Sequence, residues 1–147
     1  MTSIDSWIEA HARFTPDKPA VLFDGMVLSY REMARAVATV AGLLRDRHGV
    51  RRGDRVACML PRTPELLVVV LGALRAGAVY QPLFTAFGSG AIEYRLTRAE
   101  TKLVVTDGDN RHKFDGVNGC PPVLLVNRDN SAAEHQQDMD FQQQLDL

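Results

Sequence analysis

The longest run of apolar residues in the chain predicts a buried helix over residues 64–76. Thr63 suits the N-cap, and Pro64 suits the first helical position because its missing N–H would have no partner there in any case. From Leu66 to Leu74 every residue except Gly72 is apolar, so this helix is expected to have no solvent-facing side. Three consecutive valines would also suit a strand. The length of the run and its Thr-Pro start favour the helix.

The rest of the chain alternates between strand-like and helix-like patterns. An amphipathic helix at 6–14 precedes two short strands, 20–23 and 27–29, which the Asp24-Gly25 dipeptide is expected to join as a hairpin. The later predicted elements are a helix at 30–48, strands at 55–60 and 78–81 (the second inside the sheet), a helix at 89–99, and strands at 102–106 and 123–126. The long connections between these strands imply parallel crossovers. The sequence therefore predicts an α/β fold, with a layered, mainly parallel sheet, helices on both faces and a small N-terminal antiparallel hairpin.

Start and stop signals bracket the predicted helix at 30–48. Ser29 and Glu32 have the spacing of a capping box, in which each side chain satisfies an N–H group of the other residue. Gly49 follows a basic last turn and is expected to end the helix. Spacings of four, three and four residues place the following side chains on one buried face: Met33, Val37, Val40 and Leu44.

Composition and charge argue against several kinds of partner. The chain has 147 residues, of which 46% are apolar and 24% charged, and its formal net charge is −1. Such a balance does not indicate binding to nucleic acid or to an anionic membrane. The longest apolar run is about half of the ~20 residues that cross a bilayer. Because the N-terminus is acidic where a signal peptide is basic, we expect a cytoplasmic location.

The composition changes near residue 128. Residues 128–147 hold one arginine and five acidic residues, and their apolar residues are too sparse to form a core. We therefore predict two parts, a folded subdomain at 1–127 and a polar, acidic tail at 128–147 that is poorly ordered or weakly helical.

Cysteine and histidine usage gives no sign of a metal or disulfide site. Cys58 lies in an apolar strand and Cys120 lies beside two prolines, so both are expected to be structural. The four histidines lack the spacing of metal ligands: His11, His48, His112 and His135.

Two polar segments follow predicted strands and are candidates for ligand binding. Gly88-Ser89-Gly90 opens a helix, but Glu93 stands where the dinucleotide fingerprint has its third glycine, so a turn with Ser89 as N-cap is the simpler interpretation. The segment from Asp107 to Arg111 follows the strand at 102–106, and ligands of open α/β sheets gather beyond the carboxyl ends of strands. A polar turn exposed to solvent is the alternative.

Several short motifs resemble one enzyme family when they are taken in order. They are residues 16–20 (PDKPA), 28–32 (LSYRE), 53–57 (GDRVA), 64–65 (PE) and 74–83 (LRAGAVYQPL). This order resembles the N-terminal part of the AMP-forming acyl-CoA synthetases. Residues 84–88 (FTAFG), 94–96 (YRL) and 103–107 (LVVTD) resemble the acetyl-CoA and medium-chain acyl-CoA synthetase branch. The likeness covers roughly residues 5–126, and relatives usually follow Phe-Gly with proline where this chain has Ser89.

The resemblance implies an ATP-dependent enzyme that activates a carboxylic acid as acyl-AMP and transfers the acyl group to CoA, with Mg as a further cofactor. Members carry a Ser/Thr/Gly-rich phosphate loop ending in Pro-Lys, later aspartate and arginine motifs, and a C-terminal catalytic lysine. None of these motifs lies in the 147 residues. We therefore expect an N-terminal fragment that is inactive alone, binds no cofactor and self-associates through exposed apolar surface.

The resemblance also implies one site residue. An arginine after the corresponding strand contacts the CoA phosphates in the family, and Arg111 is the best match, with Lys113 as a weaker candidate. No catalytic residue and no metal ligand is expected in this chain. Two alternatives stay open, a free-standing α/β module that binds a nucleotide or other ligand, and a catalytically silent fragment that acts through interaction.

Overall fold

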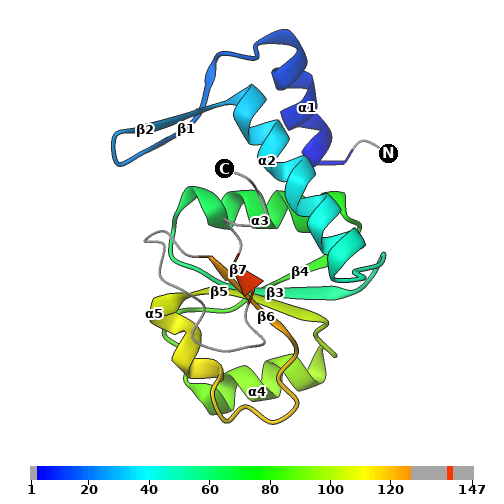
Figure 1. Ribbon diagram of the computed structural model, residues 1–147, viewed down its shortest axis with the longest axis vertical. Coiled ribbons are helices and arrows are strands. Elements are labelled where there is room, and N and C mark those ends of the chain that lie inside the picture. The colour runs from blue at the N-terminus through cyan, green and yellow to red at the C-terminus, as the bar shows by residue number, and fades with distance from the viewer. Residues whose placement is uncertain (1–2, 127–138, 141–147) are drawn as a thin grey trace. The chain divides into compact units, whose positions relative to one another are not determined.

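The described part of the computed structural model, residues 3–126 and 139–140, consists of two compact units, and the chain passes between them three times. The first unit comprises residues 3–52 and 62–78, and the second comprises 53–61 with the described residues from 79 onward. The first unit is helical and carries the antiparallel hairpin. The second holds the parallel sheet. The predicted α/β fold with a parallel sheet and an N-terminal hairpin is confirmed (Figure 1).

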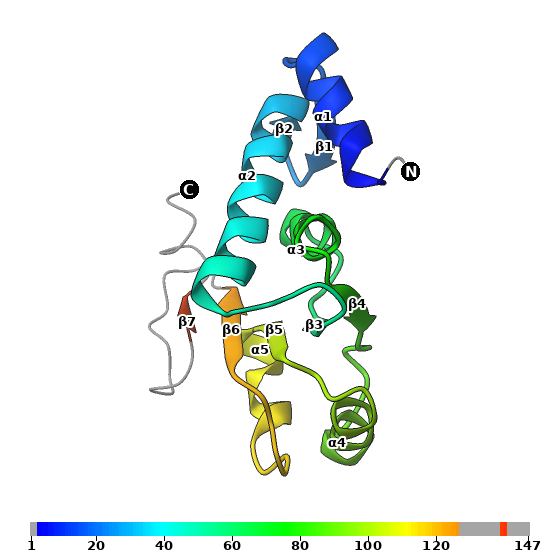
Figure 2. The ribbon, with the colours of Figure 1, turned by 90° about the vertical axis from the view of Figure 1, so that its right-hand side faces the viewer.

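The first unit contains α1 (Asp5–Phe14), β1 (Pro19–Phe23), β2 (Met26–Ser29), α2 (Tyr30–Gly42) and α3 (Pro64–Arg75). Helices α1 and α3 both pack against α2, as Figure 2 shows. Asp24 and Gly25 have φ values of 46° and 77°, and two positive φ angles are what a tight I′ hairpin turn requires. The predicted helix at 6–14 and the predicted hairpin are therefore confirmed.

Helix α2 begins at the predicted capping box. The backbone N–H of Ser29 donates to Glu32 Oε2 at 2.8 Å, and the N–H of Glu32 donates to Ser29 Oγ at 3.3 Å. These bonds to Ser29, the backbone one first, lower the pKa of the Glu32 carboxyl. The helix widens into a π-helical turn over Leu43–Arg47 before Gly49 ends it with a φ of 61°. The sequence predicted the stop but not the wide turn.

Helix α3 packs against α2 through a glycine. A Cβ atom built on Gly72 would lie 2.5 Å from Cγ1 of Val40, which is closer than real Cβ atoms come to other atoms. The one glycine in the apolar run therefore lies where the two helices approach each other closely. The predicted four-residue face is confirmed over α2 and the π-helical turn that follows it, since Met33, Val37, Val40 and Leu44 are all buried.

One expectation about α3 was wrong. Leu67 is 40% exposed, so the helix does have a solvent-facing side despite its uniform apolar sequence. Thr63 occupies the N-cap position and Pro64 begins the helix, as predicted, although the Thr63 side chain makes no capping hydrogen bond. Other large apolar side chains of this unit also reach the surface, among them Trp7, Phe14 and Leu22. The predicted self-association stays a prediction.

The sheet of the second unit has the strand order β4-β3-β5-β6-β7, and every neighbouring pair is parallel. Its strands are β3 (Arg55–Met59), β4 (Val79–Pro82), β5 (Leu103–Asp107), β6 (Val123–Val126) and β7 (Met139–Asp140). Within the described residues β4 is an edge strand, so its predicted place inside the sheet was wrong. Strand β7 falls in the predicted tail, whose other residues lie outside the described part of the chain. The boundary at 127/128 stays a prediction.

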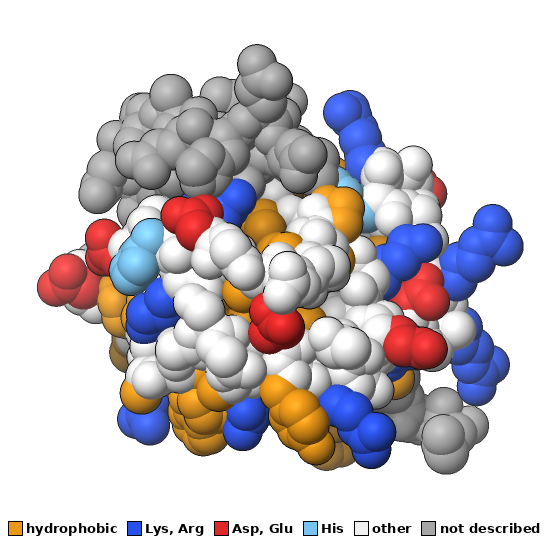
Figure 3. Space-filling view, turned by 90° about the horizontal axis from the view of Figure 1, so that it is seen from below, with side chains coloured by type: hydrophobic (Ala, Val, Ile, Leu, Met, Phe, Trp, Pro, Cys, Tyr) orange, Lys and Arg blue, Asp and Glu red, His pale blue; other side chains and the backbone are white. Residues whose placement is uncertain are grey.

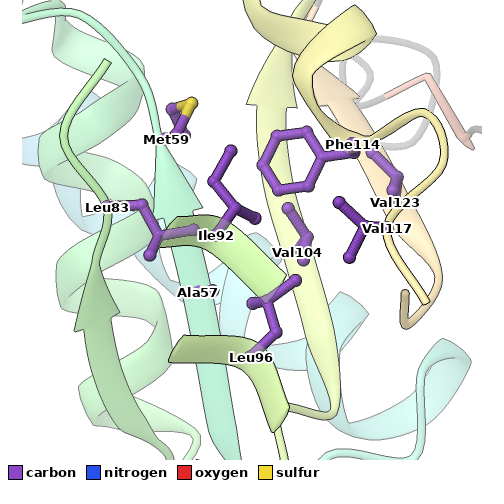
Figure 4. Packing of buried hydrophobic residues seen from close by; sticks show 9 residues of the cluster. All are labelled: Ala57, Met59, Leu83, Ile92, Leu96, Val104, Phe114, Val117 and Val123. Carbon is purple, nitrogen blue, oxygen red and sulfur yellow. The ribbon is translucent and has the colours of Figure 1, made fainter. Parts of the chain in front are cut away.

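Helix α4 (Ser89–Arg98) covers one face of this sheet. Ile92 and Leu96 point from the helix toward strand residues such as Ala57 and Val104, as Figure 4 shows, and the two helix side chains are buried as predicted. Near the C-terminal end of the helix, Gln81 Nε2 of β4 donates to the carbonyl oxygen of Arg95 at 3.1 Å. Helix α4 is therefore attached both by apolar packing and by a bond to one of its last carbonyl groups.

The close approach at Gly72 gives a first prediction. Gly72→Ala should lower the free energy of unfolding by about 1–3 kcal/mol, because the new methyl group overpacks the contact with Val40 and outweighs the better helix propensity of alanine. Gly90→Ala in α4 is the matched control, since a Cβ there meets nothing within 4 Å. Urea unfolding of both variants makes the comparison. Equal or higher stability of the Gly72 variant would contradict the close approach.

The capping box gives a second prediction. Ser29→Ala should lower the free energy of unfolding by about 1 kcal/mol at neutral pH, while Ser29→Thr, which keeps the hydroxyl, should change it little. Because the folded pKa of Glu32 is lowered, its contribution is present above the unfolded pKa and is lost as pH falls through the folded value. The Ser29→Ala variant should therefore lose less stability than the unsubstituted chain on acidification below about pH 4.5. Urea titrations at several pH values test this, and parallel pH profiles would argue against the cap.

Candidate functional site

The carboxyl ends of β4 and β5 lead into two segments that contact each other. The first is the loop 83–88 before α4, and the second is α5 (Gly108–Arg111) followed by the short 3-10 helix η2 (His112–Phe114). Both strands run parallel to β3, so their carboxyl ends lie at the same edge of the sheet, where ligands of such sheets bind. We take these two segments as the candidate site.

Asp107 fixes the start of the second segment. Its Oδ1 atom accepts hydrogen bonds from the backbone N–H of Asn110 at 3.0 Å and from Asn110 Nδ2 at 2.7 Å. The carboxylate thus caps a single helical turn, as Asp does at helix N-termini. The polar stretch that could have been an open turn is a short helix because its first residue supplies this cap.

Arg111 lies on α5 and is held by a carboxylate. Its Nη1 atom lies 3.2 Å from Oδ1 of Asp115, one helical turn further on, and the arginine side chain is only 13% exposed. The alternative of a polar turn exposed to solvent is therefore wrong for Arg111. The guanidinium is oriented by its surroundings, while its role toward CoA stays a prediction.

Lys113 joins the two segments of the candidate site. Its Nζ atom donates to the backbone carbonyl of Thr85, and its own carbonyl accepts a hydrogen bond from Ser89 Oγ at 3.0 Å. The predicted role of Ser89 as N-cap was wrong, because Gly88 holds that position and the serine hydroxyl turns to Lys113. No sequence motif pointed to this link, since its partners are 24 and 28 residues apart.

Aromatic side chains in the loop 83–88 escaped the sequence analysis. The rings of Phe84 and Phe87 meet edge to face with centroids 5.4 Å apart, and the Arg95 guanidinium carbon lies 4.0 Å from the Phe87 centroid. Phe84 is 73% exposed. On the side of the molecule viewed in Figure 3, hydrophobic side chains reach the surface between basic ones. The sequence could have indicated this contact, because Arg95 follows Phe84 and Phe87 closely and lies on the next predicted helix.

The Gly88-Ser89-Gly90 segment makes no close contact with the rest of the described chain at its two glycines. A Cβ atom at Gly88 or Gly90 would meet nothing within 4 Å, so packing against the chain requires glycine at neither position. Glu93, which breaks the fingerprint, accepts a hydrogen bond from the N–H of Asn118 at 2.9 Å. The Glu93 carboxylate therefore holds the loop before β6 in place.

Cys58 is a structural residue, as predicted. Burial, and then the charge of Asp107, raise the pKa of the Cys58 thiol to about 12, so the thiol stays protonated near neutral pH and is a poor nucleophile. Burial, and then Cys58, likewise raise the pKa of Tyr80 to about 12. Within residues 3–126 and 139–140, no three His, Cys, Asp or Glu side chains gather in a way that could hold a metal ion. His135 lies outside the described residues.

The model of the AMP-binding enzyme family matches residues 8–146, which is nearly the whole chain. The chain belongs to the AMP-binding enzyme family. This match confirms the family that the ordered motifs resembled. None of the helices in the described residues is long and apolar enough to cross a membrane.

Members of the AMP-binding enzyme family with curated names include close matches to the chain. Acetyl-coenzyme A synthetase 2 of Candida glabrata is 34% identical over 110 residues, which cover 71% of this chain and 16% of that protein. Acetyl-coenzyme A synthetase of Emericella nidulans is 33% identical over 135 residues, which cover 81% of this chain and 20% of that protein. The chain therefore spans about a fifth or less of the length of these relatives.

A solved structure agrees with these matches. The crystal structure of Brucella canis acyl-CoA synthetase superposes with a TM-score of 0.84 and 39% sequence identity, covering 99% of this chain and 28% of that one. The chain thus has the fold of the corresponding part of an acyl-CoA synthetase within the AMP-binding enzyme family.

Proposed function

We propose that this chain is the N-terminal part of an ATP-dependent, AMP-forming acyl-CoA synthetase, an acid–thiol ligase. The parent enzyme joins a carboxylic acid to AMP with release of pyrophosphate, and then passes the acyl group to the thiol of CoA. The observation that carries this proposal is the family match over residues 8–146, and the likeness to an acyl-CoA synthetase at 39% identity supports it. A cytoplasmic location is part of the proposal.

In this proposal the chain supplies scaffold and one side of the CoA site. The family's phosphate loop and magnesium ion stabilise charge on the transferring groups, which is usually the largest catalytic effect. The sequence of 147 residues contains no Ser/Thr/Gly-rich loop ending in Pro-Lys. Residues of the parent outside this chain would therefore hold ATP and Mg.

Arg111 is the residue of this chain that we assign to CoA. A guanidinium pairs with phosphate through two parallel charged hydrogen bonds, whereas an ammonium acts as a point charge. The contact with Asp115 orients the plane of the guanidinium before any ligand arrives. A group oriented in advance loses less conformational freedom on binding. The place of Arg111 beyond the carboxyl end of β5 also suits a ligand site.

A third prediction concerns the 147-residue chain alone. It should show no acid-dependent exchange of pyrophosphate into ATP, because it lacks the motifs that stabilise the triphosphate and the acyl phosphate. The assay uses acetate, butyrate and benzoate, with a heat-killed sample as the control. Pyrophosphate exchange above that control with any of the three acids would contradict the scaffold role.

A fourth prediction concerns Arg111 in the parent synthetase. Arg111→Ala should raise the KM for CoA about tenfold, the effect of losing a charged hydrogen bond worth ~1.5 kcal/mol. Pyrophosphate exchange should stay close to that of the parent because adenylation precedes CoA entry. Arg98→Ala is the matched control, since Arg98 is an exposed arginine at the C-terminal end of α4, away from the two segments of the candidate site. If exchange and thioester formation fell equally, or neither changed, Arg111 would not be a CoA ligand.

A further inference from the structure

Two hydrogen bonds connect Lys113 of η2 to the loop 83–88 and to Ser89, the first residue of α4. Ser89 Oγ donates to the carbonyl of Lys113 at 3.0 Å, and Lys113 Nζ donates to the carbonyl of Thr85. One link lies just after Phe87 and the other just before it. Lys113 therefore holds the loop at Thr85 through its side chain, and holds the start of α4, just after the loop, through its backbone carbonyl.

The backbone of Lys113 is itself fixed by its neighbours. Phe114 is 2% exposed and belongs to the hydrophobic cluster beneath α4, where Figure 4 shows its ring between Ile92 and Val123. Arg111, two residues earlier, is paired with Asp115. The lysine stem thus starts from an anchored segment, and its ammonium group is directed at the loop.

We propose that Lys113 is a positioning residue that holds the loop 83–88 beside Arg111 and does not itself bind a phosphate of CoA. A lysine that moved to a ligand phosphate would give up the Thr85 carbonyl and release the loop that it connects. This inference rests on the proposed function, because it assigns Lys113 a part in the same CoA site. It separates the roles of two cations that the sequence alone treats as alternatives.

The loop gains a fixed shape from this arrangement. Its own hydrogen bond, from the N–H of Phe87 to the carbonyl of Phe84 at 3.0 Å, closes the turn between the two links. The loop also displays Phe84 at the surface. A loop that is already ordered loses less conformational entropy when a ligand binds. The hydrogen bonds of Lys113 should therefore tighten CoA binding, although Lys113 does not contact CoA.

The first test measures the loop itself in the 147-residue protein. Hydrogen exchange of the Phe87 amide should become about fivefold faster in Lys113→Met and in Ser89→Ala, the effect of one lost hydrogen bond. Lys102→Met, which changes an exposed lysine at the opposite end of β5, should leave this rate unchanged. An unchanged rate in Lys113→Met would overturn the inference whatever the enzyme does.

The second test measures the KM for CoA in the parent synthetase as a double-mutant cycle. Lys113→Met and Ser89→Ala should each raise the KM about fivefold, and the double variant should raise it by less than the product, because both act on one loop. Multiplying effects, or an effect of Lys113→Met without one of Ser89→Ala, would make Lys113 a ligand and overturn the inference.

Arg111→Ala separates failure of this inference from failure of the proposed function. If Arg111→Ala raises the KM but the two loop variants do not, the CoA site stands and the positioning role falls. Suppose instead that all three variants leave the KM for CoA unchanged while the Phe87 amide exchanges faster. The hydrogen bonds of Lys113 then hold the loop, but CoA does not bind at this edge of the sheet, and both the proposed CoA site and the positioning role are wrong.

Discussion

The parallel pairing of β3 with β5 is the constraint on which the candidate site depends. Thr106 lies opposite Met59 in this pairing, and its buried hydroxyl donates to the Met59 carbonyl at 2.9 Å. This bond fixes the register at the carboxyl end of the two strands. Asp107 then falls at the last position of β5, where its carboxylate caps α5. A slip of one residue would turn that carboxylate to the other face of the sheet and remove the cap.

The position of α4 follows from contacts at both ends of the helix. Arg55 at the start of β3 donates to the carbonyl groups of Ala99 and Glu100, the two residues that follow the helix. At the other end Ser89 reaches Lys113, which in turn holds the loop before the helix. The amino end of β3 and the segment after β5 thus hold opposite ends of one helix. The geometry of a ligand site at the carboxyl ends of the strands therefore depends on these contacts more than on the sequence of the loop.

Local patterns in the sequence were sufficient to predict most elements. The apolar period of α2, the capping box at Ser29 and the Asp24-Gly25 turn are each decided by residues within a few positions of one another. The ordered motifs also gave the family, because short matches in a fixed order are specific even when each one is weak. Fold class and family were therefore accessible without coordinates.

The errors arose where distant residues decide the outcome. The edge position of β4 depends on the order of strands in space, and the partner of Ser89 is 24 residues away. Leu67 is exposed although its neighbours in sequence are apolar, because tertiary packing and not composition sets which side of α3 is covered. The burial of Arg111 could not be foreseen either, since it depends on how α5 packs. Lys113 was the weaker candidate for CoA on the family resemblance, whereas its position makes it a link between two segments.

Hydrogen exchange of the parent synthetase, with a stable acyl-adenylate analogue bound, tests most directly whether this edge of the sheet receives CoA. On addition of saturating CoA, amides of residues 84–88 and 108–113 should exchange more slowly, while those of the hairpin at 19–29 should not change. Protection confined to other regions of the enzyme at full CoA occupancy would contradict the account.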